Sequence, residues 1–438
     1  MGSASNRKVV LSWALYDWGN SAFATTVMAG FFPLFFKQYW SAGASSQDST
    51  FQLGLSNSLA SVLVAFAAPV LGVLADRSRR KKRFLLLFTV LGVLATGGLV
   101  LVDKGDYFNA ALLYVLGSVG FFAGIVFYDA LLVGVAEESQ RDRISALGYG
   151  FGYLGGGLLF AINVAMTLAP ARFGLRDAAQ AVRVSFVMVA VWWAIFSVPL
   201  LRWVPEPASP VESSSTPSAR DDPSRGFGVG AAARSALGEL WQTLQSVRQQ
   251  RAVWLFLLGY WLYIDGVDTI IRMAVDYGLS LGFSSQALIT ALLITQFVGF
   301  PAALAYGYLG QRIGAKRGIL FGLLIYVAVT VFGYYMDSEP EFYILAVVVG
   351  LVQGGVQALS RSFYSRLIPA EKSAEFFGFY NMLGKFAAVI GPTLMGAVGK
   401  LTGSHRVAIL SIALLLIGGA WLLLRVPDGD APAATELG

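Results

Sequence analysis

The chain has 438 residues, of which 56% are hydrophobic and 13% charged, and its mean hydropathy is +0.64. Soluble domains average about 45–50% apolar and about 25% charged residues, so this composition indicates an integral membrane protein. The absence of cysteine excludes disulfides and thiolate metal sites, and a single histidine, His405, argues against a histidine-ligated metal or a histidine-based triad. We therefore expect that the protein binds no metal ion or cofactor and is not an enzyme.

Apolar stretches of spanning length recur along the whole chain. A bilayer core about 30 Å thick needs roughly 20 apolar residues per helix. The runs are continuous rather than alternating, which favours helices over barrel strands. Twelve transmembrane helices are predicted, at 9–40, 52–75, 84–102, 107–136, 144–169, 182–203, 252–276, 284–309, 318–336, 342–368, 376–400 and 406–425.

The basic residues predict the orientation. With the N-terminus inside, the inner segments hold 22 Lys and Arg residues and the outer loops hold 6. The positive-inside rule then places both termini in the cytoplasm of a multi-pass protein of the cell inner membrane. The net charge of +6 reflects a cytoplasmic face that meets anionic lipid, so nucleic-acid binding is not expected.

The chain divides into two similar halves. We expect an N-terminal six-helix bundle at 1–203, a cytoplasmic linker at 204–251, a C-terminal six-helix bundle at 252–425 and a cytoplasmic tail at 426–438. The linker begins Pro/Ser-rich and polar, and its second part, 231–251, has apolar residues at helical spacing.

Three pairs of short matches support a duplication. They lie in the same order in both halves, at offsets of 235 to 248 residues. The pairs are GVLADR (72–77) with GYLGQR (307–312), Phe127-Tyr128 with Phe363-Tyr364, and Trp13 and Asp17 with Trp261 and Asp265.

The first of these motifs resembles the loop between helices two and three of the major facilitator superfamily, a transporter fold of two six-helix bundles with pseudo-two-fold symmetry. The chain departs from that motif at Arg79, where glycine is usual, and at Gln311, which replaces the second aspartate. The resemblance implies a gate that closes one face: glycine permits close helix approach, aspartate can cap a neighbouring helix, and arginines can bridge to the other bundle. The implied gating residues are Gly72, Asp76, Arg77, Arg80, Gly307 and Arg312.

Further motifs are similar to signatures of the autophagy-related vacuole effluxer-like family within that superfamily. They are YDWGNSA (16–22), Tyr263-x-Asp265-Gly266-Val267, Ser360-Arg361-Ser362, and Gly384-Lys385 with Gly391-Pro392. This resemblance implies a small-solute permease, with amino-acid efflux as the best-known assignment. The substrates of the bacterial branch are largely undefined, so the resemblance does not identify the solute.

Charged residues inside the predicted spans point to a site. Each costs at least ~2.5–3.5 kcal/mol at the bilayer centre on insertion scales, so each needs a structural or functional reason. In the facilitator fold the helices that carry them line or flank the central cavity, and amides on the same helix faces extend the set. The candidate substrate-binding residues are Asp17, Asn20, Asp129, Asp265, Gln353, Gln357, Arg361 and Lys385.

The alternative explanation is that these charges form ion pairs that only specify helix packing. Asp268 and Arg272, four residues apart, can satisfy each other in this way. Asp17, Arg361 and Lys385 have no opposite charge within a turn of their own helices, which favours a functional role.

The sequence therefore predicts a monomeric secondary transporter that works by alternating access on a small polar or zwitterionic solute. Arg361 would bind a carboxylate or phosphate, Lys385 would add a point charge, and Asp17 or Asp265 would bind an amine. Amino acids or related metabolites, efflux and proton coupling are the favoured assignments. A lysophospholipid or other anionic amphiphile, and a channel or scramblase, remain the alternatives.

Overall fold

The structure is a computed structural model that describes residues 3–43, 46–206, 245, 248 and 250–427. Most of the predicted linker at 204–251, including nearly all of its amphipathic part, lies outside the described residues. The same holds for the predicted tail beyond residue 427.

Long helices account for nearly all of the described chain. Among the described residues, eleven helices are long and apolar enough to cross a membrane. They are α3 (Ser46–Ser78), α4 (Lys81–Gly98), α5 (Tyr107–Val135), α6 (Arg141–Leu168), α7 (Ala178–Trp203), α9 (Arg251–Ser280), α10 (Ser285–Ile313), α11 (Ala315–Tyr335), α12 (Glu339–Leu367), α13 (Ser373–Thr402) and α14 (His405–Leu424). The first and last residues of each helix lie close to those of a predicted span.

The first predicted span differs from a plain α-helix. It is a helical rod from Ser3 to Trp40 that consists of α1 (Ser3–Ala22), the π-helix η1 (Phe23–Phe31), α2 (Phe32–Phe35) and the π-helix η2 (Phe36–Trp40). Pro33 has no N–H and interrupts the α-helical hydrogen-bond ladder between the two π segments. The hydropathy pattern contains no signal for this change of helix type.

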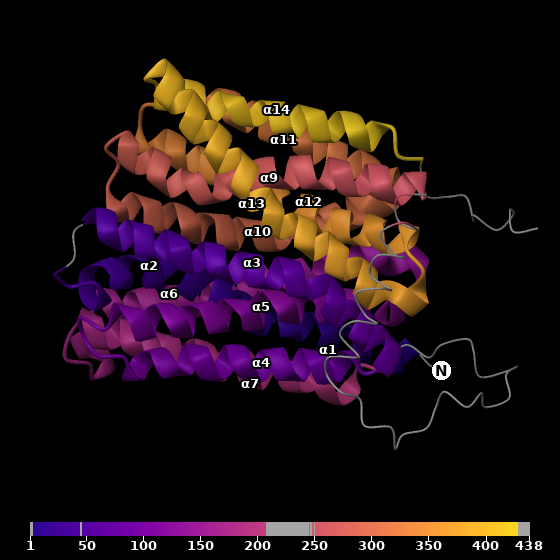
Figure 1. Ribbon diagram of the computed structural model, residues 1–438, viewed down its shortest axis with the longest axis horizontal. Helices are drawn as coiled ribbons and strands as arrows, with labels where there is room; N and C mark the ends of the chain where they lie inside the picture. The colour runs from indigo at the N-terminus through magenta and orange to yellow at the C-terminus, as the bar shows by residue number, and fades with distance from the viewer. Residues whose placement is uncertain (1–2, 44–45, 207–244, 246–247, 249, 428–438) are drawn as a thin grey trace, which may run out of the picture.

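The two halves of the chain form two bundles that lie side by side, the first from indigo to magenta and the second from orange to yellow (Figure 1). Within the first half, α1 packs on α6 and α7, and α4 packs on α5 and α7. Within the second, α9 packs on α14 and α13, and α12 packs on α10 and α11. The main contacts between the halves are α6 with α10 and α3 with α13.

The two ends of the bundle differ in how their helix N-termini are capped. At the far end, Asp106, Asp177, Ser284 and Ser404 accept hydrogen bonds from the first turns of α5, α7, α10 and α14. At the other end, where α1 begins and α7 ends, the N-caps of α4, α6, α11 and α13 provide no side-chain bond. We call this second end the linker end; its uncapped helices need donors or acceptors from elsewhere.

Glycines allow the closest helix contacts. A Cβ on Gly120 of α5 would lie 2.6 Å from Gly92 Cα of α4, and a Cβ on Gly155 of α6 would lie 2.6 Å from the Trp18 ring of α1. Small residues at such positions let helix backbones approach in a membrane, where packing rather than hydrophobic burial drives association.

We expect Gly120→Ala to destabilise the first bundle by about 1–3 kcal/mol, because overpacking forces α4 away from α5. Thermal unfolding of the detergent-purified protein measures this. Gly54→Ala is the matched control, since a Cβ at Gly54 would meet nothing within 4 Å. Equal melting temperatures for both variants would contradict the packing role of Gly120.

Candidate transport site and gate

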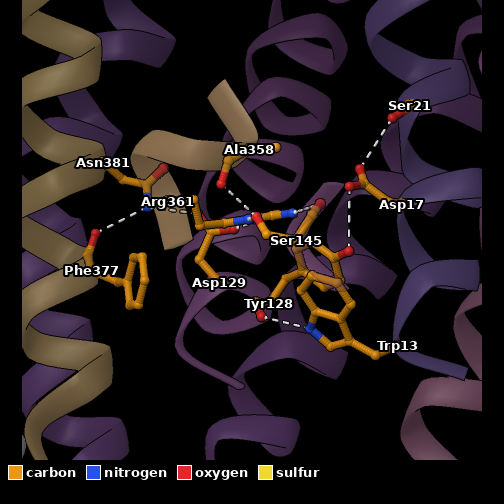
Figure 2. Close-up of polar contacts among 10 residues, drawn as sticks. All are labelled: Trp13, Asp17, Ser21, Tyr128, Asp129, Ser145, Ala358, Arg361, Phe377 and Asn381. Atoms are coloured by element: carbon orange, nitrogen blue, oxygen red, sulfur yellow. Dashed lines mark hydrogen bonds and ion pairs between the residues drawn. The ribbon is translucent and has the colours of Figure 1, made fainter. Parts of the chain in front are cut away.

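Arg361 of α12 lies at the centre of the contact between the halves and is 2% exposed. Its Nη1 donates to Asp129 Oδ1 of α5 at 3.0 Å, its Nε to Ser145 Oγ of α6 at 2.9 Å, and its Nη2 to the Ser145 carbonyl at 2.8 Å. Figure 2 shows the guanidinium between these partners. All three nitrogens of the guanidinium are therefore engaged by the first half of the chain.

Aromatic rings surround the same guanidinium. Its central carbon lies 4.4 Å from the Tyr149 ring, 5.0 Å from the Trp13 ring and 5.3 Å from the Tyr128 ring. Trp13 and Tyr128 stack at 4.4 Å, and the Trp13 indole N–H donates to the Tyr128 carbonyl (Figure 2). These ring faces stabilise a cation that has left water.

Two further polar contacts strengthen this junction. Asn381 of α13 donates its amide to Asp129 Oδ2 at 3.3 Å, and Ser145 Oγ donates to the Ala358 carbonyl at 2.8 Å. Both bonds join helices of different halves (Figure 2). Asp129 is thus the acceptor for two helices of the second half.

Asp17 of α1 has a different environment, although it lies beside the Arg361 junction. It is partly exposed and accepts hydrogen bonds from Ser21 Oγ at 3.2 Å and from the Tyr128 hydroxyl at 3.3 Å (Figure 2). Within the described part of the chain it makes no ion pair. Gly152 of α6 packs closely against it: a Cβ at this position would lie 3.2 Å from Asp17 Oδ1.

Asp265, the counterpart of Asp17 in the second half, is fully buried away from this junction. Both of its carboxylate oxygens accept the Gly391 N–H of α13 at 3.0 Å, and Thr269 Oγ1 donates to Oδ1 at 3.3 Å. The structure thus places the two homologous acids in separate sites.

The other predicted site residues are spread over the same helices. Lys385 Nζ lies 3.4 Å from the centroid of the Phe122 ring of α5, across the contact between the halves. Asn20 is 1% exposed, and Gln353 and Gln357 are partly exposed on α12, with Gln353 Oε1 buried and without a hydrogen-bond partner. The side chain of Arg272 lies outside the described residues.

The predicted gate residue Asp76 caps a helix of the other half. Its Oδ2 accepts the Glu375 N–H at 2.8 Å, which is the third N–H of α13. An N-cap side chain normally accepts this N–H, and the N-cap of α13, Lys372, provides none. Asp76 therefore replaces the missing cap from α3.

The basic partner of Asp76 is Lys81. Its Nζ pairs with Asp76 Oδ1 at 2.9 Å and donates to Ser373 Oγ of the other half at 2.8 Å. Arg80 and Arg312 are exposed and make no ion pair with any described residue. In this structure the bridge to the other bundle is thus made by Lys81 at the start of α4, and a gating role for the two arginines stays a prediction.

The second copy of the motif also contacts the other half, but as a hydrogen-bond donor. Gln311 at the end of α10 donates to the Ser139 carbonyl just before α6 at 3.1 Å. A Cβ at Gly72 would lie 2.7 Å from Glu375 Cα, and one at Gly307 would lie 2.7 Å from Ala146 Cβ. The glycine of each motif thus permits close approach to a helix of the other half, as predicted.

Several residues that the sequence did not single out complete the gate. Asp142 of α6 is 3% exposed and accepts from Ser362 Oγ at 2.5 Å and from Arg366 Nη2 at 2.8 Å, both of α12. Arg141 donates to the Ser365 carbonyl at 2.9 Å. Asp142 lay outside the predicted span that begins at 144, so its burial had no hydropathy signal.

Except for the Asp76–Lys81 ion pair, which lies within the first half, these polar contacts join the two halves at or near the linker end. They include ion pairs, hydrogen bonds to carbonyls and a helix cap in trans, and each must break if the halves separate there. We call this set the latch: Asp76, Lys81, Asp129, Arg141, Asp142, Ser145, Gln311, Arg361, Ser362, Arg366, Ser373 and Asn381.

We expect Asp129→Ala to cost about 3–5 kcal/mol, because it leaves the Arg361 guanidinium buried without its carboxylate. Asp129→Ala combined with Arg361→Met should recover much of that stability, since a methionine fits among the three rings. Thermal unfolding of the single and double variants checks this. A double variant no more stable than Asp129→Ala would mean that the charge pair is not the reason for the loss.

We expect Asp76→Asn to open the linker end more often without unfolding the protein. The chain has no native cysteine, so Ser365→Cys, nearly isosteric and 1% exposed, introduces a single thiol that a maleimide reaches only when the latch opens. Asparagine can still accept the Glu375 N–H, but it loses the ion pair with Lys81 and the favourable negative charge at the start of α13, which should cost about 1 kcal/mol, or about fivefold in labelling rate. Asp103→Asn, an exposed acid at the far end, is the control. Equal labelling rates for Asp76→Asn and Asp103→Asn would contradict the role of the Asp76 carboxylate in holding the linker end closed.

Comparisons with known proteins agree with this architecture. The human organic anion transporter MFSD10 (TETRAN) superposes with a TM-score of 0.68 at 17% identity, over 97% of this chain and 100% of that chain. The proton:xylose symporter XylE, a major facilitator superfamily protein, superposes with a TM-score of 0.73 at 13% identity, over 98% and 97%. At these identities the likeness establishes the fold: the predicted major facilitator fold of two six-helix bundles is confirmed.

Sequence relatives define the family more closely. An uncharacterized MFS-type transporter, YxiO, of Bacillus subtilis is 37% identical over 426 residues, which cover 95% of this chain and 94% of that protein. Autophagy-related protein 22 of Yarrowia lipolytica is 25% identical over 80% of this chain and 71% of that protein. The model of the family described as "Vacuole effluxer Atg22 like" matches residues 5–431. The chain belongs to this family and is a multi-pass membrane transporter of the major facilitator superfamily, not an enzyme.

Proposed function

We propose that this transporter moves a small zwitterionic solute, most simply an amino acid or a related metabolite, by alternating access. The observation that carries the proposal is the difference between its two central charges. The Arg361 guanidinium donates to the Asp129 carboxylate and twice to Ser145, whereas the Asp17 carboxylate accepts hydrogen bonds only from hydroxyl groups. Asp17 is therefore the group that gains most from a bound ammonium.

This assignment changes the role that the sequence suggested for Arg361. Three of the five guanidinium N–H groups already donate to protein oxygens, and one of these acceptors is the Asp129 carboxylate, so a solute carboxylate would have to compete with protein partners at Arg361. Arg361 acts in the latch in this conformation, and Lys385 of α13 is the cation that we assign to the carboxylate of the solute. The family name, an effluxer, supports outward movement of the solute.

We further propose the orientation, the membrane and the coupling. The excess of Lys and Arg at the linker end supports a cytoplasmic position for that end and for both termini, in the inner membrane of the cell. The latch then closes the cytoplasmic side. Asp17 has hydroxyl rather than cationic partners, so it is the acid that we assign to proton coupling in a monomeric carrier.

We expect Asp17→Asn to weaken the binding of amino acids about 10-fold to 100-fold, because a charge-assisted bond to the ammonium is lost while the side-chain shape is kept. Thermal shifts with the standard L-amino acids, and counterflow in proteoliposomes, measure this. N-acetylated amino acids, which have no ammonium, are the control ligands and should not bind to the wild type.

Three outcomes would contradict the proposal. Equal affinity of wild type and Asp17→Asn for every amino acid that binds would remove Asp17 from the site. Solute flux without trans-stimulation in counterflow would indicate a channel or scramblase. Binding of lysophospholipids alone would favour an amphiphile as the solute.

A further inference from the structure

Asp265 is a buried acid that the proposed site does not use. It is 0% exposed, and it makes no ion pair with any residue that the structure describes. Its partners are the Gly391 N–H, 3.0 Å from each carboxylate oxygen, and the Thr269 hydroxyl at 3.3 Å. A carboxylate held in this way inside a membrane protein is costly, so its donors must be well placed.

The Gly391 N–H that donates to Asp265 lies next to a proline within α13. Pro392, the next residue, has no N–H, so the hydrogen-bond ladder of the continuous helix α13 lacks one bond at this turn; we call this missing bond the break. A Cβ on Gly391 would lie 2.8 Å from Asp265 Oδ1 and would collide with Thr269 Oγ1. Only glycine lets the carboxylate reach the backbone at the break.

The break divides α13 into two segments with different partners. The segment before it carries the contacts to the first half: the Glu375 N–H with Asp76, Asn381 with Asp129, and Lys385 over Phe122. After the break, Gly399 lies against Ala408 of α14, which belongs to its own half. Any change of angle at the break therefore moves the latch segment relative to the second bundle.

We propose that Asp265 is a positioning residue: its carboxylate holds α13 at the Gly391–Pro392 break in the geometry that presents the latch segment to the first half. Hydrogen bonds are directional and weaken steeply with misalignment, so a small rotation at the break loses both contacts to Gly391 together. Asp265 thereby sets the ratio of open to closed forms at the linker end without contacting the solute.

This role joins two motifs that are far apart in the sequence, around Asp265 in α9 and Gly391-Pro392 in α13. Neither motif lies in the latch itself. Their contact explains why an acid and a proline occur at matching depths of two neighbouring helices. The homologous Asp17 faces Gly152 of a helix that has no proline at that turn, and its carboxylate stays available.

Maleimide labelling of the full-length Ser365→Cys protein in proteoliposomes tests this role. Asp265→Asn keeps the size of the side chain but leaves one acceptor oxygen instead of two, so we expect labelling to be about 3-fold to 10-fold faster than in the wild type. The thermal shifts produced by the standard L-amino acids, tested singly, should stay within about twofold in half-saturating concentration. Asp103→Asn provides the matched control.

A second variant keeps the test decisive if Asp265→Asn does not fold. Thr269→Val removes one donor to the carboxylate with little change in volume and should speed labelling in the same direction, by a smaller factor. Labelling at the wild-type rate in either folded variant would overturn the proposal. So would weaker amino-acid binding by Asp265→Asn with unchanged labelling, because Asp265 would then contact the solute. The labelling result does not depend on whether amino acids are the solute.

Discussion

The buried pair of Arg361 and Asp129 is the interaction on which the arrangement of the two bundles depends. A guanidinium at 2% exposure is tolerable only while the opposite half supplies its carboxylate, carbonyl and hydroxyl acceptors. The pair therefore ties α12 to α5 and α6 at one depth and in one register. The remaining latch contacts follow from that register, because Ser362, Ser365 and Arg366 continue the same helix toward the linker end.

The internal duplication extends to the contacts and then diverges where the functions differ. Asp17 and Asp265 each accept from a hydroxyl four residues later, and Asp76 and Gln311 each reach the chain at or just before the start of a helix of the other half. The first acid faces a glycine and stays partly exposed, whereas the second is buried and accepts the Gly391 N–H, next to the proline of α13. The duplicated scaffold has thus placed its two matching acids in different environments, which agrees with the different roles that we propose for them.

Hydropathy and charge counts were sufficient to predict the helices, and the repeated motifs were sufficient to predict the halves and the cap by Asp76. Both signals are local, because the residues that form a span or a motif are adjacent in the sequence. The partners of Arg361 could not be predicted, because Asp129 and Ser145 are more than 200 residues away and only the fold makes them neighbours. Asp142 was missed since it lies at a helix end, where a charge in a loop and a buried charge have the same sequence pattern.

The chemistry of the latch suits a structure that must open in every cycle. Each of its neutral contacts exchanges for a contact with water when the halves separate, so each contributes only about 0.5–1.5 kcal/mol net. A hydrophobic seal of the same area would be harder to open into water, because its apolar surface would have to be hydrated. Polar contacts that water can replace therefore make separation of the halves at the linker end less costly than an apolar seal would.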